Sequence, residues 1–349
     1  MKTILVTGAS GFIGSFIVSE ALKQGYEVWA GMREGSSKKY LKEPGIKFAY
    51  LDMTKQERLT QQLRDYKQMM GGRGWDYVVH AAGATKSLTR EGFFKTNTEC
   101  TRNLVKVLKS EGMVPERFVF ISSLSIFGAI REQATQKRTK KNLWIYSPIK
   151  SSDMPMPNTA YGESKLEAEK YLPLANPFPY VILRPTGVYG PREKDYFLMA
   201  DSIKKHVDFA VGYKPQEITF VYVMDVVQAV FKAFTAKGVE GKAYFLSDGE
   251  VYDSRRFSDL LQEEIGEPNV YHIKAPLWFL WIVCAISGLV NGWMGKLTTL
   301  NLDKYHILSQ RNWQCDIEPA RRDLGYEPQY KLEQGVKETV AWYKKEGWL

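Results

Sequence analysis

The chain alternates short apolar runs with longer segments in which apolar residues recur at helical spacing. We predict the apolar runs to be buried strands, at residues 4–6, 26–32, 47–51, 77–80, 118–121 and 180–183, with a last one inside 241–250. Amphipathic segments separate them, for example from Gln56 to about Met70. Strands that alternate with helices indicate βαβ units, and therefore an α/β fold with a doubly wound parallel sheet. Ligands of such sheets bind at the carboxyl ends of the strands.

The first predicted strand runs into a turn that is rich in glycine, within the sequence KTILVTGASGFIG of residues 2–14. Three glycines, three residues apart, let the backbone turn sharply and approach a diphosphate: Gly8, Gly11 and Gly14. A helix that begins at Phe12 or Ile13 would point its free amides at that anion. Glycines alone are a weak signal, but a strand before them and an amphipathic helix after them make the motif informative.

This GxxGxxG turn resembles the glycine motif of the extended short-chain dehydrogenase/reductase family. The resemblance implies a Rossmann-type sheet with a smaller C-terminal substrate lobe. Residues 1–184 and 219–250 would bind the dinucleotide, and residues 185–218 and 251–349 would form the lobe. Cofactor contacts at the turn are implied for six residues: Gly8, Ser10, Gly11, Phe12, Ile13 and Gly14.

The end of the second predicted strand bears on which dinucleotide is bound. In the family pattern Met32 takes the position of the usual aspartate, and Arg33 follows it. An acidic side chain here accepts from the ribose 2′-hydroxyl, whereas an arginine accommodates a 2′-phosphate. We therefore expect NADP, with Lys38 adding positive charge to the pocket. Glu34 keeps NAD as the alternative, and all of these residues would also suit a solvated loop.

Later strand ends carry the remaining cofactor contacts that the resemblance implies. They are Asp52 and Met53, then Ala81, Ala82 and Gly83, then Ser122, and finally Pro185, Thr186 and Val188. His80 precedes the three small residues at the fourth strand end. We expect His80 to be a packed or hydrogen-bonded structural residue and not a base.

The candidate chemistry lies in the sequence TAYGESKLEAEKYL, where Tyr161 and Lys165 are four residues apart on one helix face. A free tyrosine has a pKa of about 10, and a nearby ammonium favours its phenolate. The resemblance implies that Tyr161 is the general acid/base, that Lys165 lowers its pKa and holds the ribose, and that Ser123 orients a carbonyl. It also implies a structural and proton-relay role for Asn97.

Ser122 and Ser125 are alternatives to Ser123 for the catalytic hydroxyl. All three hydroxyls would also suit a structural role, because serines at a strand end can satisfy backbone groups.

Two features distinguish the substrate lobe. Gly187 and Ile218 stand where nucleotide-sugar epimerases and dehydratases usually have an asparagine and an arginine. Residues 275–290, APLWFLWIVCAISGLV, are uncharged but shorter than the roughly 20 residues that a membrane-spanning helix needs. This segment would suit a buried core helix, an apolar substrate wall, or a membrane-surface contact as in the 3β-hydroxysteroid dehydrogenase branch. Lys296 and Lys304 beyond it would suit an anionic lipid surface.

Composition bears on disulfides, metal sites, cellular location and nucleic-acid partners. A chain of 349 residues can bury a large core, and three widely spaced cysteines (Cys100, Cys284 and Cys315) predict no disulfide framework and no metal site. The N-terminus leads directly into the first strand, so we expect a cytoplasmic protein. The net charge of +9 is spread along the chain, so we expect no nucleic-acid partner. The basic insertion 129–158 is a solvated face or a lid over the substrate.

We therefore predict an NADP-dependent oxidoreductase that acts on an alcohol/carbonyl pair of a hydrophobic, steroid-like small molecule. A nucleotide-sugar epimerase or dehydratase is the first alternative, and a non-catalytic cofactor-binding regulator is the second. The intact set of Ser123, Tyr161 and Lys165 argues against the regulator. A homodimer is implied by analogy with the family alone.

Overall fold

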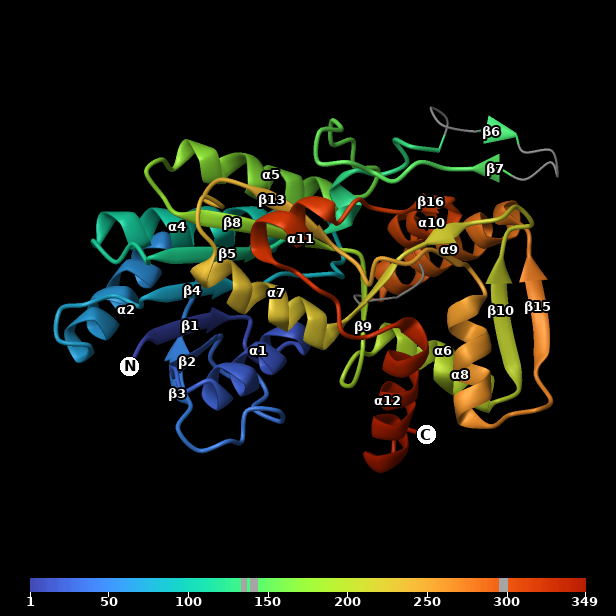
Figure 1. Ribbon diagram of the computed structural model, residues 1–349, viewed down its shortest axis with the longest axis horizontal. Coiled ribbons are helices and arrows are strands. Elements are labelled where there is room, and N and C mark those ends of the chain that lie inside the picture. The colour runs from blue at the N-terminus through green and yellow to red at the C-terminus, as the bar shows by residue number, and fades with distance from the viewer. Residues whose placement is uncertain (133–136, 139–143, 295–300) are drawn as a thin grey trace.

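Figure 1 shows the computed structural model of the chain, which describes every residue except 133–136, 139–143 and 295–300. Seven strands form one parallel sheet in the order β13–β8–β5–β4–β1–β2–β3. Their bounds are β1 Thr3–Thr7, β2 Glu27–Met32, β3 Lys47–Tyr50, β4 Tyr77–His80, β5 Arg117–Ile121, β8 Tyr180–Pro185 and β13 Ala243–Leu246. The strand order reverses between β1 and β4, so the carboxyl ends of these two strands border a ligand crevice.

Helices cover both faces of this sheet (Figure 1). One face carries α1 (Phe12–Lys23) and α7 (Val223–Thr235), and the other carries α2 (Gln56–Met69), α4 (Cys100–Ser110) and α5 (Ala160–Leu174). Side chains alternate along β1, because Ile4 and Val6 pack in the α1 and α7 core while Leu5 packs in the opposite core. The near-continuous apolar strands follow from burial on both faces, and the predicted doubly wound parallel sheet is confirmed.

Short elements connect the sheet to the rest of the chain. They are α3 Arg90–Phe93, the π-helical turn η1 Phe94–Glu99, the 3₁₀ turn η2 Leu124–Ile126, β6 Lys137–Arg138, β7 Trp144–Ile145, β9 Gly187–Tyr189, β11 Glu217–Ile218, β12 Phe220–Tyr222, β14 Tyr252–Asp253, β16 Asn312–Trp313 and α11 Glu318–Leu324. Asp225 in α7 accepts hydrogen bonds from the backbone amides of Gln329 (2.8 Å) and Tyr330 (3.1 Å). This carboxylate therefore ties the sheet side of the molecule to the segment before the last helix.

A lobe lies beside the sheet (Figure 1). It has its own core, which is rich in aromatic side chains. Its larger elements are α6 Asp195–Lys204, β10 Val207–Val211, α8 Arg256–Ile265, β15 Tyr271–Ala275, α9 Leu277–Trp293, α10 Leu302–Ser309 and α12 Leu332–Lys345. The Phe257 ring lies 5.0 Å from the ring of Phe220 and 5.4 Å from that of Tyr189, measured between centroids. These rings join α8 to β12 and β9, which begin near the carboxyl end of β8.

The uncharged segment 275–290 forms most of α9, and it is not a buried core helix. Trp278, Trp281 and Trp293 are 66%, 50% and 91% exposed. Among the residues that the structure describes, no helix is long and apolar enough to cross a membrane.

The basic insertion is described only in part. The Arg131 guanidinium pairs with the Asp153 carboxylate, with Nε donating at 2.9 Å, so this cation has a structural partner. Lys140 and Lys141, and with them part of the expected lid, lie outside the described residues.

The glycine turn provides a stability prediction. A Cβ atom on Gly14 would lie 2.2 Å from the Gly8 carbonyl oxygen, which is a backbone atom that cannot rotate away. We expect Gly14→Ala to lower the free energy of unfolding by roughly 1–3 kcal/mol in urea denaturation without cofactor. Gly288→Ala in α9 is the matched control, because its nearest neighbour would be 4.0 Å away. Equal stability of wild type and Gly14→Ala would contradict the close packing of the turn.

Candidate active site

The glycine turn after β1 forms a cradle of backbone groups. Gly8 has a φ of +70°, and a Cβ there would lie 2.6 Å from the amide nitrogen of Ala82. α1 begins at Phe12 with Gly11 as its N-cap, and no side chain caps its first amides. Free amides at the start of a helix favour an anion, so this turn fits the diphosphate of a dinucleotide.

Positively charged groups lie at the end of β2, where the adenosine ribose of a dinucleotide is expected. Arg33 is exposed, and its guanidinium has no ion-pair partner among the described residues. Arg58 of α2 lies 3.6 Å from Glu34 and 3.6 Å from Asp52, between nitrogen and oxygen atoms. Sequence reasoning missed Arg58, although a basic residue early in the helix after the third strand was an available signal. Lys38 holds its ammonium 4.0 Å from the centre of the Phe48 ring.

Asn97 lies in the π-helical turn η1, where its side chain is buried. Its Oδ1 accepts from the backbone amide of Ala84 at 2.7 Å, and its Nδ2 donates to the Ala84 carbonyl at 3.0 Å and to Ser164 Oγ at 2.9 Å. From residue type alone an asparagine in a helix is expected on the surface. The π turn instead aims this amide inward, so that it fastens the loop after β4 to α5.

Ser123 and Tyr161 meet at the carboxyl end of β5. Ser123 Oγ caps the turn η2 by accepting from the Ser125 amide at 3.1 Å, and it is hydrogen-bonded to the Tyr161 hydroxyl. α5 begins here because its N-cap residue Thr159 accepts from the Gly162 amide at 3.0 Å. The Tyr161 amide in turn donates to Asp303 Oδ2 of α10 at 3.4 Å, which brings the lobe against this end of α5.

The pKa of Tyr161 differs from the expectation. Burial raises it, and the hydrogen bond with Ser123 lowers it by less, so the protein's own groups leave the tyrosine protonated near neutral pH. The phenolate that a nearby ammonium was expected to favour is therefore not formed by the described residues alone.

Lys165 is buried one helical turn after Tyr161. Its ammonium donates to the Ile121 carbonyl at 2.7 Å and lies 4.5 Å from the centre of the Phe120 ring. Burial lowers the pKa of Lys165 to about 8, while the carboxylate of Glu169 acts in the opposite direction. Glu169 was not predicted, although the same four-residue spacing that joins Tyr161 to Lys165 reaches it.

Gly83, which follows β4, lies close to both Asn97 and Lys165. A Cβ on Gly83 would lie 3.1 Å from Asn97 Oδ1 and 3.5 Å from Lys165 Nζ. The structure thus brings the ends of β4 and β5, η1 and α5 to one place, which is where the sequence placed its catalytic candidates.

His80 is a hydrogen-bonded structural residue, as predicted. Thr101 Oγ1 gives its proton to the Asn97 carbonyl at 2.7 Å, so His80 Nε2 must donate to Thr101 Oγ1 at 2.9 Å. His80 Nδ1 then accepts from Thr7 Oγ1 at 2.7 Å. Burial lowers the pKa of His80 to about 3, and the imidazole remains neutral.

Ser122 and Thr186 differ in what their hydroxyls contact. Ser122 Oγ is buried and has no hydrogen-bond partner among the described residues. An unpaired buried hydroxyl costs about 1–3 kcal/mol, so this atom fits a site in which a bound ligand completes the hydrogen bond. Thr186 Oγ1 donates to the Thr219 carbonyl at 2.8 Å, whereas Pro185 ends β8 and Val188 lies in β9.

The substrate side of the crevice contains a tyrosine that sequence reasoning missed. A Cβ on Gly187 would lie 2.5 Å from the Tyr196 hydroxyl oxygen, so Tyr196 fills the space that a side chain at position 187 would need. The Tyr196 ring packs 4.6 Å from that of Phe257, between centroids. No local pattern links residues 187 and 196, and only the fold brings them together. Nearby, Lys86 after β4 pairs with Asp195 of α6 at 2.5 Å, across the two sides of the crevice.

Comparisons with known proteins agree with this geometry. Residues 4–247 match the NAD dependent epimerase/dehydratase family. The decarboxylating sterol-4-alpha-carboxylate 3-dehydrogenase of Dictyostelium discoideum is 26% identical over 353 residues, or 97% of this chain and 100% of its own length. The UDP-glucose 4-epimerase of Vibrio cholerae is 26% identical over 349 residues, or 97% of this chain and 94% of its own.

A solved structure shows the same fold. The dTDP-glucose 4,6-dehydratase of Bacillus anthracis in complex with NAD superposes with a TM-score of 0.74 at 18% identity, covering 100% of this chain and 98% of that one. The predicted Rossmann-type fold is confirmed.

The lowered pKa of Lys165 gives a pH dependence of stability. Its pKa is about 8 in the folded chain and 10.5 as the ordinary value. Burial of the charged Lys165 ammonium therefore destabilises the folded chain by its full amount below pH 8. This destabilisation disappears as the pH rises to 10.5, because the unfolded chain binds more protons than the folded chain in this interval. We expect wild type to gain up to roughly 3 kcal/mol over this interval relative to Lys165→Met, measured by urea unfolding.

Lys237→Met, at an exposed lysine, is the control for this experiment and should keep the wild-type pH profile. Parallel profiles of wild type and Lys165→Met would show that the ammonium is not destabilised by burial.

Proposed function

Because the chain belongs to the NAD dependent epimerase/dehydratase family of enzymes, we propose that it transfers a hydride between NADP(H) and an alcohol/carbonyl pair on a hydrophobic, steroid-like substrate. The observation that carries the proposal is the convergence of Ser123, Tyr161 and Lys165 at the carboxyl end of β5. Residues 1–184 and 219–250 would hold the dinucleotide, and residues 185–218 and 251–349 would hold the substrate.

Each of these side chains has a distinct task. The bound nicotinamide dinucleotide supplies the hydride chemistry. Tyr161, which burial keeps protonated, gives its proton to the carbonyl oxygen during reduction, and Ser123 donates a hydrogen bond to the same oxygen. Lys165 binds the nicotinamide ribose, and its ammonium favours the phenolate that remains after proton transfer. Asn97 is a positioning residue, because it holds the loop after β4 against α5.

The proton-donor role gives a direct test. Tyr161→Phe should lower the rate of hydride transfer by about 10²–10⁴-fold, because the general acid is removed, while cofactor affinity stays nearly unchanged. Lys165→Ala should damage both. Tyr171→Phe on the same helix is the matched control and should retain wild-type kinetics. A Tyr161→Phe enzyme with most of its activity would exclude this residue as the acid.

NADP is favoured over NAD by the charges at the end of β2. Arg33 has no carboxylate partner in the described part of the chain and is free to meet a 2′-phosphate. Glu34, the group that would favour NAD, lies 3.6 Å from Arg58 instead. Arg58 thus draws the Glu34 carboxylate to itself and leaves the Arg33 guanidinium available, which suits a phosphate better than a hydroxyl.

Arg33→Ala should therefore weaken NADPH binding by roughly 1.5–3 kcal/mol, or about tenfold or more, and leave NADH binding little changed. Fluorescence titration of both cofactors measures this, with the exposed Arg73→Ala as the control. Equal losses for the two cofactors, or a wild type that prefers NADH, would contradict the NADP assignment.

A hydrophobic substrate is favoured by what the lobe presents to the crevice. The two relatives named above carry the names of a sterol dehydrogenase and a UDP-sugar epimerase, and each is 26% identical, so identity does not choose between them. Two features of the site support the sterol: Gly187 and Ile218 supply no polar group for a nucleotide diphosphate, and the Tyr196 hydroxyl occupies the place of an asparagine side chain at 187. Apolar surface buried at about 25 cal/mol per Å² would bind a sterol skeleton without a phosphate anchor.

Thermal shift tests this choice. In the presence of NADP, sterols or similar fused-ring alcohols should raise the melting temperature, and UDP- or dTDP-sugars should not. The converse ranking would assign the enzyme to nucleotide sugars.

The same proposal includes a cytoplasmic location. It also includes peripheral membrane contact through residues 275–290, because a sterol-like substrate partitions into lipid. A homodimer completes it, and sedimentation velocity of the full chain tests that oligomeric state.

A further inference from the structure

The outer face of α9 is apolar among the residues whose side chains the structure describes. Its exposed side chains are Trp278, Phe279, Trp281, Ile282, Ile286, Leu289, Val290 and Trp293. The inner face packs through Leu280 and Cys284, which are 8% and 0% exposed. An exposed helix of a water-soluble protein normally places its polar residues outward, whereas α9 places its apolar residues outward.

The two-stranded sheet that precedes α9 in the sequence also turns an apolar face outward. β10 and β15 pair in parallel, with Val207 opposite Tyr271 and Phe209 opposite Ile273. Because side chains alternate along a strand, these four share one face of the sheet. Phe209, Tyr271 and Ile273 are 59%, 76% and 46% exposed, so that apolar face is turned to the outside.

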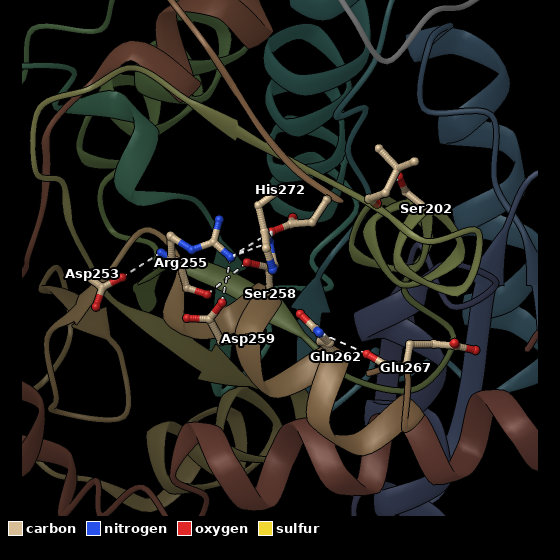
Figure 2. Close-up of polar contacts among 10 residues, drawn as sticks. Ser202, Asp253, Arg255, Ser258, Asp259, Gln262, Glu267 and His272 are labelled. Carbon is tan, nitrogen blue, oxygen red and sulfur yellow. Dashed lines mark hydrogen bonds and ion pairs between the residues drawn. The ribbon is translucent and has the colours of Figure 1, made fainter. Parts of the chain in front are cut away.

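The other face of this sheet is polar and points inward. Asp208, opposite His272, is 2% exposed and accepts from Arg255 Nη2 at 2.9 Å. Figure 2 shows Arg255 and His272 directed at each other above α8, with Asp259 on the same guanidinium at 2.8 Å. His272 Nδ1 lies 3.1 Å from Asp208 Oδ2. This polar cluster fixes the sheet to α8 and keeps its apolar face outward.

Cations without carboxylate partners border both apolar faces. A cleft of about 280 Å³ joins the end of β10 to the start of α9 and is lined by Tyr213, Lys214, Trp278 and Arg311, among others. Lys214 and the Arg311 guanidinium form no ion pair with the described residues. Within residues 271–293 no acidic residue occurs.

We propose that α9 and the outer face of β10 and β15 form a docking surface for a lipid bilayer that contains anionic phospholipid. The tryptophans and aliphatic side chains enter the headgroup and acyl boundary, and Lys214 and Arg311 lie at the level of the lipid phosphates. Lys296, which the sequence associates with this surface, lies outside the described residues. The docking surface deepens the membrane contact included in the proposed function, and the entry of the substrate from this bilayer rests on that function as well.

A second copy of the chain is the competing occupant of this surface. A two-fold interface brings the same patch of both subunits together, so the unpaired Lys214 and Arg311 would meet an equally cationic surface. Anionic lipid supplies the missing negative charge and the apolar medium at once. The tryptophans near both ends of α9 also suit the boundary between lipid and water.

Co-sedimentation of the full chain with phosphatidylcholine vesicles, with and without phosphatidylserine, tests the proposal. Wild type should bind the vesicles that contain phosphatidylserine. Trp281→Glu should bind at least about tenfold more weakly, because a charge replaces an inserted indole. Lys214→Glu should bind about fivefold more weakly or worse, because Lys214 lines the cleft at the start of α9.

Matched controls are Leu174→Glu, at a leucine of α5 that is 80% exposed, and Lys237→Glu, at an exposed lysine far along the chain from this surface. Both should bind as wild type does. Each variant is at an exposed position, and circular dichroism checks that its fold is retained.

Three results would overturn the proposal: wild type that stays in solution with phosphatidylserine vesicles, Trp281→Glu that binds as tightly as wild type, or a wild-type dimer that Trp281→Glu dissociates in sedimentation velocity. Failure of the proposed function looks different, since vesicle binding would persist while sterol ligands give no thermal shift.

Discussion

The buried ammonium of Lys165 is the constraint on which the active site depends. A cation out of water needs compensation, and here the Ile121 carbonyl and the Phe120 ring supply it from the end of β5. Glu169, one turn further along α5, adds a negative charge and is itself held by Arg184 of β8, with Nη2 donating at 2.6 Å. The ion pair and the ammonium thus fix α5 against two strands of the sheet, and Tyr161 at the start of the helix takes its place beside Ser123 as a consequence.

The lobe has aromatic side chains in its core and an apolar face on its outside. Aromatic rings of β9, β12 and α8 form its core and place Tyr196 against Gly187 in the crevice. The cluster of Asp208, Arg255 and His272 directs the polar face of the small sheet toward α8, which leaves an apolar face outside. The lobe therefore has a buried aromatic core beside the crevice and an exposed apolar surface on its outside.

Sequence patterns predicted the sheet well, because a strand buried on both faces is a continuous apolar run whatever its neighbours are. The strands at β1, β4 and β5 begin and end within a residue or two of the prediction. The four-residue spacing of Tyr161 and Lys165 likewise follows from helix geometry alone. Both features depend on residues that are close together in the sequence, so sequence patterns predict them.

The missed features depend on contacts between distant segments. Hydropathy did not show whether α9 is buried or exposed, since an apolar run suits both. The inward amide of Asn97 needed the π turn, and the role of Gly187 needed Tyr196 from the next helix. The direction of the Tyr161 pKa shift depended on the burial of its hydroxyl, which no pair of residues in the sequence displays.

Transfer of isotope tests the central claim, that this crevice moves a hydride to an external carbonyl. The full chain is incubated with NADPH deuterated at the nicotinamide C4 position and with a 3-keto steroid, and the product is analysed by mass spectrometry. We expect deuterium on the new carbinol carbon and one NADP formed for each alcohol. A steroid that gains no deuterium, together with a UDP-sugar that is epimerised without net loss of cofactor, would contradict it.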